Sequence, residues 1–216
     1  MPANTLEIVM RHLHPVRLLL LAVLAGAAAS CSDSSAPPVD TTKPPSELSI
    51  IHVAPVSTPL WNSSVSFYAK KGEDREGQIF FQDASGQQGE EYLRLRVDAP
   101  SLQSMPDGTP IAEGDSVLIT VTVVDPTEML FEMQPTGLKF SPADPARLKI
   151  HYDHADGDLN DDGKVDVSDD SIETILAIWR QETPSDPFVR LGSVLTIETD
   201  EANADLTGFS RYALAY

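Results

Sequence analysis

Val117-Leu-Ile-Thr-Val-Thr-Val-Val124 is the longest strand that the sequence predicts. β-Branched side chains fit a pleated surface, and their density here predicts a central strand that is buried on both faces. Further back in the chain, Tyr92-Leu-Arg-Leu-Arg-Val97 alternates with a period of two. In a strand this period places the leucines and Val97 on one face, and Tyr92 with both arginines on the other.

Short runs of the same kind recur on both sides of these two stretches, with turn residues between them. Val65–Ala69 and Gln78–Gln82 flank a charged segment at 70–77, which predicts a hairpin. No run up to residue 153 has convincing helical spacing, so we predict an all-β fold, an antiparallel β-sandwich over residues 48–216. The other expected strands are Leu48–Ala54, Met129–Met133, Arg147–Tyr152, Ile175–Gln181, Phe188–Leu191, Val194–Ile197 and Arg211–Tyr216.

The composition is that of a soluble globular domain, with 22% charged and 41% hydrophobic residues in a chain of 216. The formal net charge is -18. A chain this acidic repels phosphate backbones, so no nucleic-acid partner is expected. Because Cys31 is the single cysteine, the fold has no intrachain disulfide and depends on its core, with a bound metal as the further source of stability.

The N-terminal residues resemble an export signal. Basic residues precede the apolar run Leu18–Ala29, which is typical of a secretory signal peptide and too short to span a bilayer. Ala28-Ala-Ser-Cys31 is similar to the lipobox of bacterial lipoproteins, in which the cysteine is acylated and becomes the new N-terminus. The resemblance implies that residues 1–30 are removed and that acylated Cys31 anchors the protein in a membrane. The alternative is an ordinary signal peptide with a cysteine near its cleavage site.

Residues 31–47 contain prolines and hydroxyl side chains without an apolar period. This composition predicts a disordered tether between the anchor and the folded domain. The residue after the cysteine is Ser32 rather than aspartate, which by the lipoprotein sorting pattern favours the outer membrane or cell surface over the inner membrane.

Leu130-Phe-Glu-Met-Gln-Pro-Thr-Gly-Leu-Lys-Phe140, followed by the predicted strand at 147–152, resembles the ZU-five domain. That family has a β-sandwich fold and occurs in ankyrins, netrin receptors, tight-junction proteins and bacterial surface proteins. The resemblance covers about residues 92–153 and implies a structural or interaction module. A shared fold by itself says little about function.

Asp158-Leu-Asn-Asp-Asp-Gly-Lys-Val-Asp-Val-Ser-Asp169 places oxygen-bearing side chains at positions 1, 3, 5, 9 and 12 of a twelve-residue loop. Gly163 at position 6 allows a sharp turn, which is the spacing that Ca²⁺ requires. Val165 at position 8 is expected to turn into the body of the protein. Nine acidic residues and one lysine lie between Asp153 and Glu173, so a cation is needed to offset their repulsion.

This stretch resembles the calcium-binding repeat of dockerins and EF-hands. By that resemblance the loop at 156–170 binds Ca²⁺ through the side chains of Asp158, Asn160, Asp162, Asp166 and Asp169 and the backbone carbonyl of Lys164. One copy preceded by a strand is unlike the paired helical motifs, which predicts a weak site with a Kd on the order of 10⁻⁴–10⁻³ M. The alternative is a solvated acidic turn without metal.

Two further interpretations concern the residues beside this loop. His151, Asp153, His154 and Asp156 suggest a transition-metal site, but on a strand His151 and Asp153 share a face and His154 points elsewhere. After the loop, Ser168 is a candidate N-cap for one helical turn. The spacing over residues 172–181 fits a helix as well as a strand, and we favour the strand.

Gly208-Phe-Ser-Arg-Tyr-Ala213 resembles the site at which some ZU-five relatives cut their own chain. Those relatives have a histidine where this chain has Gly208, so the base that a serine nucleophile needs is missing. We therefore expect no self-cleavage and no enzymatic activity. The expected function is an exported, lipid-anchored structural or interaction module of the bacterial envelope. The alternative is a calcium-dependent adhesion module that binds a protein partner.

Overall fold

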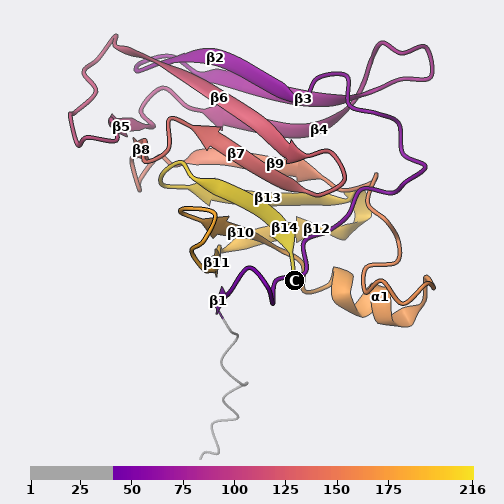
Figure 1. The fold of residues 1–216 in the computed structure, drawn as a ribbon. Helices are drawn as coiled ribbons and strands as arrows, with labels where there is room; N and C mark the ends of the chain where they lie inside the picture. The colour runs from indigo at the N-terminus through magenta and orange to yellow at the C-terminus, as the bar shows by residue number, and fades with distance from the viewer. Residues whose placement is uncertain (1–40) are drawn as a thin grey trace, which may run out of the picture. The chain divides into compact units, whose positions relative to one another are not determined.

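The computed structural model describes residues 41–216, in which most regular structure is β-strand (Figure 1). The predicted signal peptide and Cys31 lie outside the described residues. One sheet has seven antiparallel strands in the order β1-β11-β10-β14-β7-β6-β2. In that order they are Thr42–Lys43, Phe188–Arg190, Ala177–Gln181, Arg211–Ala215, Leu130–Gln134, Ser116–Asp125 and Ser64–Lys70.

The second sheet has five antiparallel strands in the order β12-β13-β9-β4-β3. In that order they are Ser193–Thr196, Glu201–Leu206, Ala146–His151, Gln88–Val97 and Arg75–Gln82. A small ribbon joins β5, Leu102–Ser104, to β8, Lys139–Phe140. The described residues also contain the helix α1, Val167–Glu173, and a 3-10 turn at Ile197–Thr199.

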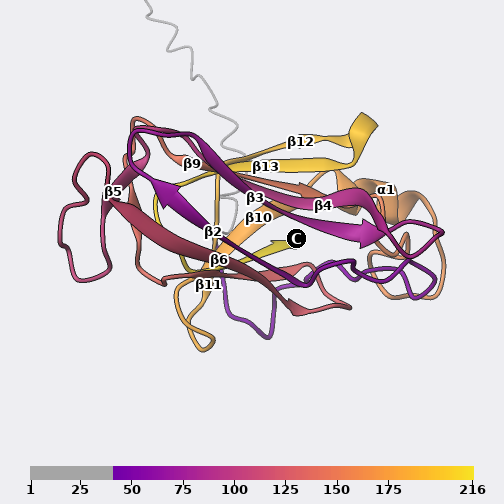
Figure 2. The same cartoon turned by 90° about the horizontal axis from the view of Figure 1, so that it is seen from above.

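The two larger sheets form the layers of a sandwich (Figures 1 and 2). β9 alternates as expected, because Leu148 and Ile150 are buried while Arg147 is exposed. These leucine and isoleucine side chains share one buried cluster with Val121 and Phe131 of the opposite sheet. Each such side chain stabilises the fold by about 1.5–3 kcal/mol on burial. The predicted all-β antiparallel sandwich is confirmed.

The predicted hairpin between β2 and β3 is wrong. β2 pairs with β6 and β3 pairs with β4, so the chain crosses between sheets over the charged segment. Gly77, which was part of the expected turn, lies within β3. A Cβ at this position would come within 2.5 Å of the Phe67 ring on β2. The glycine therefore permits close packing between the sheets.

The prediction that Val117–Val124 is buried on both faces is also wrong. Val121 is fully buried, but the neighbouring Leu118 is 49% exposed. β6 lies second from the edge of its sheet, and only its inner face packs against the other layer. Antiparallel sandwich sheets commonly bury one face only, so the density of β-branched residues overestimated the burial of this strand.

Tyr92 is buried instead of sharing an outer face with Arg94. Leu93 and Glu91 pair with consecutive residues of β3, which leaves Tyr92 as the extra residue of a β-bulge. The bulge turns Tyr92 and Leu93 both into the core. Strict alternation does not predict this arrangement, because it assumes an unbroken ladder.

The Tyr92 hydroxyl is buried and has no hydrogen-bond partner among the described residues. Burial also raises the pKa of this phenol. An unpaired buried hydroxyl costs about 1–3 kcal/mol, so Tyr92→Phe is expected to increase the free energy of unfolding by about 1 kcal/mol. The urea midpoint of the variant measures this change, and a lower midpoint would contradict the prediction.

Several strand boundaries differ from the predictions. Leu48–Ala54 forms isolated bridges at Ile50, His52 and Val53 rather than a strand. Thr42–Lys43 forms β1 on the edge of the larger sheet, so ordered structure begins before the predicted boundary at 48. β13 was not predicted, because its sequence EANADL is poor in β-branched residues. The predicted strands near β7, β9, β10, β11, β12 and β14 are confirmed with small shifts of their ends.

Candidate metal-binding sites

The acidic loop at 156–170 follows β9, runs into the first turn of α1 and is organised around Asp158. One carboxylate oxygen of Asp158 accepts a hydrogen bond from the Asp162 amide at 3.0 Å, and the other accepts from the Gly163 amide at 2.7 Å. The chain reverses here through left-handed backbone at Asp161, with φ 58°, and at Gly163, with φ 84°. Glycine adopts this conformation without steric cost, which explains its place at position 6.

The next side chains of the loop make similar bonds. The Asn160 side-chain oxygen accepts from the Asp162 amide at 2.9 Å, and Asp162 accepts from the Lys164 amide at 3.0 Å. Asp166 accepts from the Ser168 amide at 2.8 Å and is the N-cap of α1 in place of the predicted Ser168. The amide and then the hydroxyl of Ser168 hold the pKa of Asp166 below its ordinary value.

Asp169 connects the two ends of the loop and is only 4% exposed. One of its oxygens accepts from the Leu159 amide at 2.8 Å, and the other accepts from the Asp166 amide at 2.8 Å. With Asp166 it forms a capping box, which satisfies amides that the first turn of α1 leaves unpaired. Asp169 therefore holds the loop against the helix.

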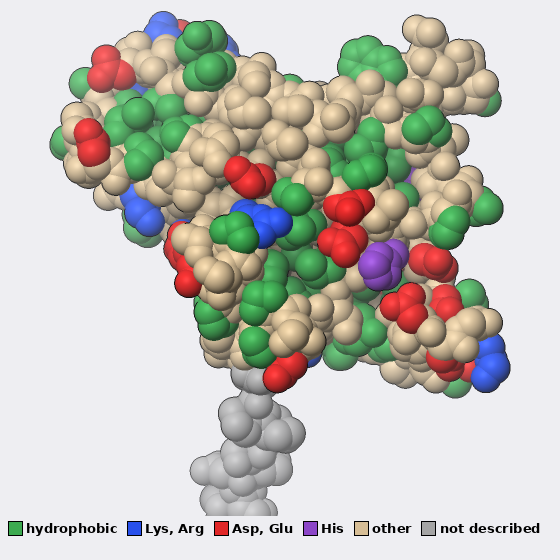
Figure 3. Space-filling model, viewed as in Figure 1, with side chains coloured by type: hydrophobic (Ala, Val, Ile, Leu, Met, Phe, Trp, Pro, Cys, Tyr) green, Lys and Arg blue, Asp and Glu red, His purple; other side chains and the backbone are tan. Residues whose placement is uncertain are grey.

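Negative charge on this loop is not offset by nearby cations. Within residues 41–216, no lysine or arginine forms a salt bridge with a carboxylate from 156 to 173. The one ion-pair contact is from His52, whose Nε2 lies 3.9 Å from Asp161. Figure 3 shows acidic side chains gathered at the lower right, over the region of the loop and α1 in Figure 1.

The prediction that Val165 turns into the protein is wrong, since this side chain is 72% exposed. Leu159 and Ile172 instead pack against the core from the two sides of the loop. Beyond the loop, α1 ends at Glu173 and β10 begins at Ala177. The strand favoured for Ile175–Gln181 is thus confirmed from Ala177 onward, whereas Ile175 and Leu176 lie between α1 and β10.

A second group of metal-ligand side chains lies outside the loop. Single ligand atoms of Glu90, Asp153 and His154 all lie within 4.8 Å of one another. His154 Nε2 is 3.3 Å from a Glu90 oxygen and 3.6 Å from an Asp153 oxygen. Burial raises the pKa of Asp153, and the neighbouring Glu90 carboxylate adds to this effect, although His154 opposes it.

The expectation that Asp153 shares a face with His151, and that His154 points elsewhere, is wrong for Asp153, which contacts His154 instead. β9 ends at His151, so the alternation assumed for the following residues does not hold. Asp153 and His154 meet Glu90, which the sequence analysis did not identify because it lies 64 positions away from His154. Asp156 bonds to the Asp158 amide instead, and His151 contacts Glu91 and Glu201.

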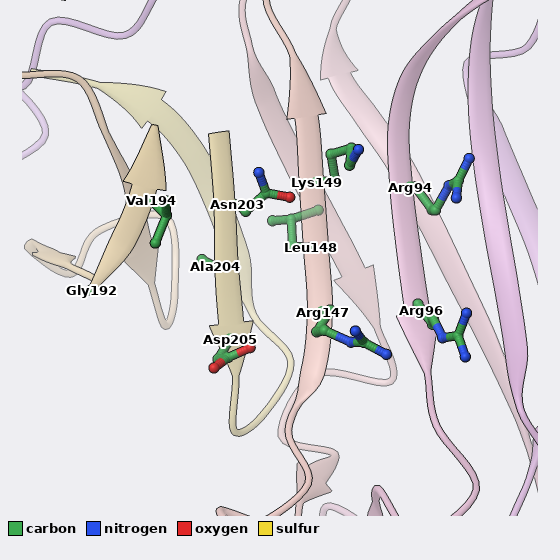
Figure 4. Close-up of a pocket in the computed structure, with 10 residues that line it drawn as sticks. All are labelled: Arg94, Arg96, Arg147, Leu148, Lys149, Gly192, Val194, Asn203, Ala204 and Asp205. Carbon is green, nitrogen blue, oxygen red and sulfur yellow. The ribbon is translucent and has the colours of Figure 1, made fainter. Parts of the chain in front are cut away.

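A hollow of about 310 Å³ on the outer face of the five-stranded sheet contains four basic side chains that the sequence analysis did not single out (Figure 4). Each already pairs with a carboxylate, and Arg96 and then Arg147 hold the pKa of Asp98 below its ordinary value. Exposed pairs of this kind form a salt-bridge network of small net stability. The pairs are Arg94–Glu91, Arg96–Asp98, Arg96–Asp74, Arg147–Asp98 and Lys149–Glu201.

Ser210, in the segment that resembles a self-cleavage site, is 1% exposed. Its hydroxyl accepts a hydrogen bond from Arg180 Nε at 2.9 Å. Arginine stays protonated in proteins, so this partner does not act as a base toward the hydroxyl. The expected lack of self-cleavage stays a prediction.

No family model, curated protein or solved structure matches the chain. The resemblances to bacterial lipoproteins, to the ZU-five domain and to the dockerin repeat therefore stay predictions. Among the described residues, no helix has the length and apolar character needed to cross a membrane.

Proposed function

We propose that this protein is an exported, lipid-anchored structural or interaction module of the bacterial envelope, with one calcium ion bound in the loop at 156–170. The N-terminal signal and Cys31 support the envelope location. The β-sandwich supports a module with a rigid body, since its two sheets share one buried core.

The observation that carries the calcium proposal is the pair of hydrogen bonds that Asp158 accepts from the amides of Asp162 and Gly163. These bonds join position 1 to positions 5 and 6 and turn the Asp158 carboxylate into the loop. Asn160 and Asp162 are held by the loop's own amides in the same way. Oxygen-bearing side chains at this spacing suit Ca²⁺, which takes six to eight oxygens in flexible geometry.

Asp158, Asn160, Asp162, Asp166 and Asp169 would hold the ion with the Lys164 carbonyl. Bound Ca²⁺ would supply the positive charge that the loop lacks. Asp158 and Asp169 each already use both oxygens for amides of the loop, so their contribution requires shared bonds or a small rearrangement. This competition supports weak affinity, suited to extracellular calcium.

Calcium is expected to raise the melting temperature of the full chain purified in detergent. With about 10 mM Ca²⁺ and a Kd on the order of 1 mM, linkage gives about 1.4 kcal/mol. For a protein of this size that corresponds to about 3–6 °C. Asp158→Ala and Asp162→Ala are expected to remove the shift, which differential scanning calorimetry in calcium and in chelator measures.

Asp170→Ala is the matched control, because it removes the same charge at an exposed position that is not a proposed ligand. This variant should keep the calcium-dependent shift. Identical melting of the wild-type chain in calcium and in chelator would overturn the calcium site. A shift of equal size in the Asp158→Ala variant would assign the effect to general charge screening instead.

A further inference from the structure

The cluster of Glu90, Asp153 and His154 is built by the pairing of two strands. β4 and β9 are antiparallel with Leu93 opposite Ile150. Beyond this last pair, Glu90 of β4 meets Asp153 and His154, which follow the end of β9. The backbone carbonyl of His154 accepts from the Ala54 amide at 2.9 Å, which fixes the chain where it leaves the sheet. The three side chains are therefore brought together by the fold.

Ser57 contacts one ring nitrogen of His154, and the carboxylates contact the other. Ser57 Oγ lies 2.6 Å from His154 Nδ1. With an ion bound at Nε2, Nδ1 carries the proton and donates to Ser57. A second partner that holds the ring in this way is typical of histidines that bind metals.

Nε2 of His154 lies beside two carboxylates. The nearest oxygens of Glu90 and Asp153 are 3.3 and 3.6 Å away. Two ligands on one tetrahedral ion, with bonds of about 2.0–2.2 Å, are separated by about 3.3–3.6 Å. The spacing therefore has room for an ion that Nε2 shares with the two carboxylates.

In the described part of the chain, these carboxylates have no other cationic partner. Within residues 41–216, neither Glu90 nor Asp153 forms a salt bridge with lysine or arginine, and His154 is their one basic partner. A second histidine, His151, provides an internal comparison. It also lies near two carboxylates, at 3.4 Å from Glu91 and 3.7 Å from Glu201. There the charge is already balanced, by Arg94 at 2.7 Å from Glu91 and Lys149 at 3.0 Å from Glu201.

We propose that Glu90, Asp153 and His154 bind a divalent transition-metal ion of the Zn²⁺ class. An imidazole nitrogen with two carboxylates suits such an ion, whereas Ca²⁺ takes oxygen ligands only. The His154 ring also stacks on Phe81, with centroids 3.9 Å apart, which limits its rotation. Ser57 is a positioning residue, because it acts on the metal through the histidine.

The fourth position of the ion would face solvent. A hollow of about 330 Å³ adjoins the cluster and is lined by Thr58, Gln82, Asp83, Ala84, Gly89, Glu90 and His154. Three protein ligands with an open position is the arrangement in which zinc keeps a water or binds a small ligand from solution. This site uses none of the ligands proposed for calcium.

Titration of the full chain with Zn²⁺ tests the proposal, with about 10 mM Ca²⁺ present to fill the acidic loop. Isothermal calorimetry should find one site per chain. His154→Gln and Glu90→Gln are each expected to weaken Zn²⁺ binding tenfold or more, and Ser57→Ala about tenfold, as for other groups that orient a metal ligand. His151→Gln is the matched control and should bind Zn²⁺ like the wild type.

Co²⁺ supplies an independent readout, because its visible absorption reports tetrahedral nitrogen and oxygen ligation. The Co²⁺ spectrum should appear in the wild type and in Asp158→Ala, and be absent in His154→Gln. Glu90 is 74% exposed on its side chain, so Glu90→Gln keeps the fold even if a variant at His154 does not. Equal Zn²⁺ affinity of the wild type and Glu90→Gln would overturn the proposal, as would loss of binding in His151→Gln alone. Neither result bears on the calcium loop, whose test uses Asp158 and Asp162.

Discussion

Asp169→Ala is expected to lower the free energy of unfolding by about 2–4 kcal/mol. The variant loses two hydrogen bonds to a buried carboxylate, each worth about 1.5–3 kcal/mol, and part of the helix cap. The amides of Leu159 and Asp166 would be left without their partner. Because these amides hold the two ends of the loop, the calcium-dependent rise in melting temperature should disappear as well.

Urea unfolding in chelator separates the structural effect from metal binding. Asp170→Ala is the control, since the neighbouring carboxylate is exposed while Asp169 is buried. This control should change the free energy of unfolding by less than about 0.5 kcal/mol. If the two variants unfold at the same urea concentration, Asp169 does not hold the loop in the way described.

Phe131→Ala should destabilise the sandwich by about 3–5 kcal/mol, the range for removal of a buried phenylalanine. Phe131 lies on β7, is 0% exposed and contacts Tyr92 of the opposite sheet edge-on, with ring centroids 5.4 Å apart. Its loss opens a cavity between the layers that neither backbone can close. The midpoint of urea unfolding measures the change, with an unaltered m-value.

Tyr68→Ala removes an aromatic ring of similar size from the outer face of β2, where it is 64% exposed. Surface substitutions of this kind change stability by about 0.5 kcal/mol or less. Equal destabilisation by Tyr68→Ala and Phe131→Ala would mean that the two faces of the seven-stranded sheet are not inner and outer as described.

The local sequence pattern predicted most strands, because alternating apolar and polar residues and runs of β-branched residues reflect burial on one face of a sheet. The pattern failed where long-range packing decides the role of a residue. The sequence predicts a turn at Gly77, but this glycine lies in a strand and makes room for Phe67 of the other sheet. Strict alternation predicts that Tyr92 faces outward, but a β-bulge turns its side chain into the core. Neither effect leaves a signal in the neighbouring residues.

The two candidate metal sites differ in the same way. The proposed calcium loop is continuous in sequence, so the spacing of its residues predicts its ligands and Gly163 predicts its turn. The other cluster requires Glu90 to meet Asp153 and His154, which depends on the register between β4 and β9. The sequence alone does not specify that register. The sequence therefore indicates His154 as a candidate ligand but not its partner Glu90.

The short strand β1 has a mechanical consequence. A pull applied to the chain ahead of Thr42 reaches β1 first, and β1 joins the sheet through only two register pairs, with β11. The next pairings along the chain are the single bridges at Ile50, His52, Val53 and Leu60, and the first long strand, β2, begins at Ser64. Under load this end of the domain should therefore extend in small steps, as these pairings break one after another, before the long strands of either sheet separate.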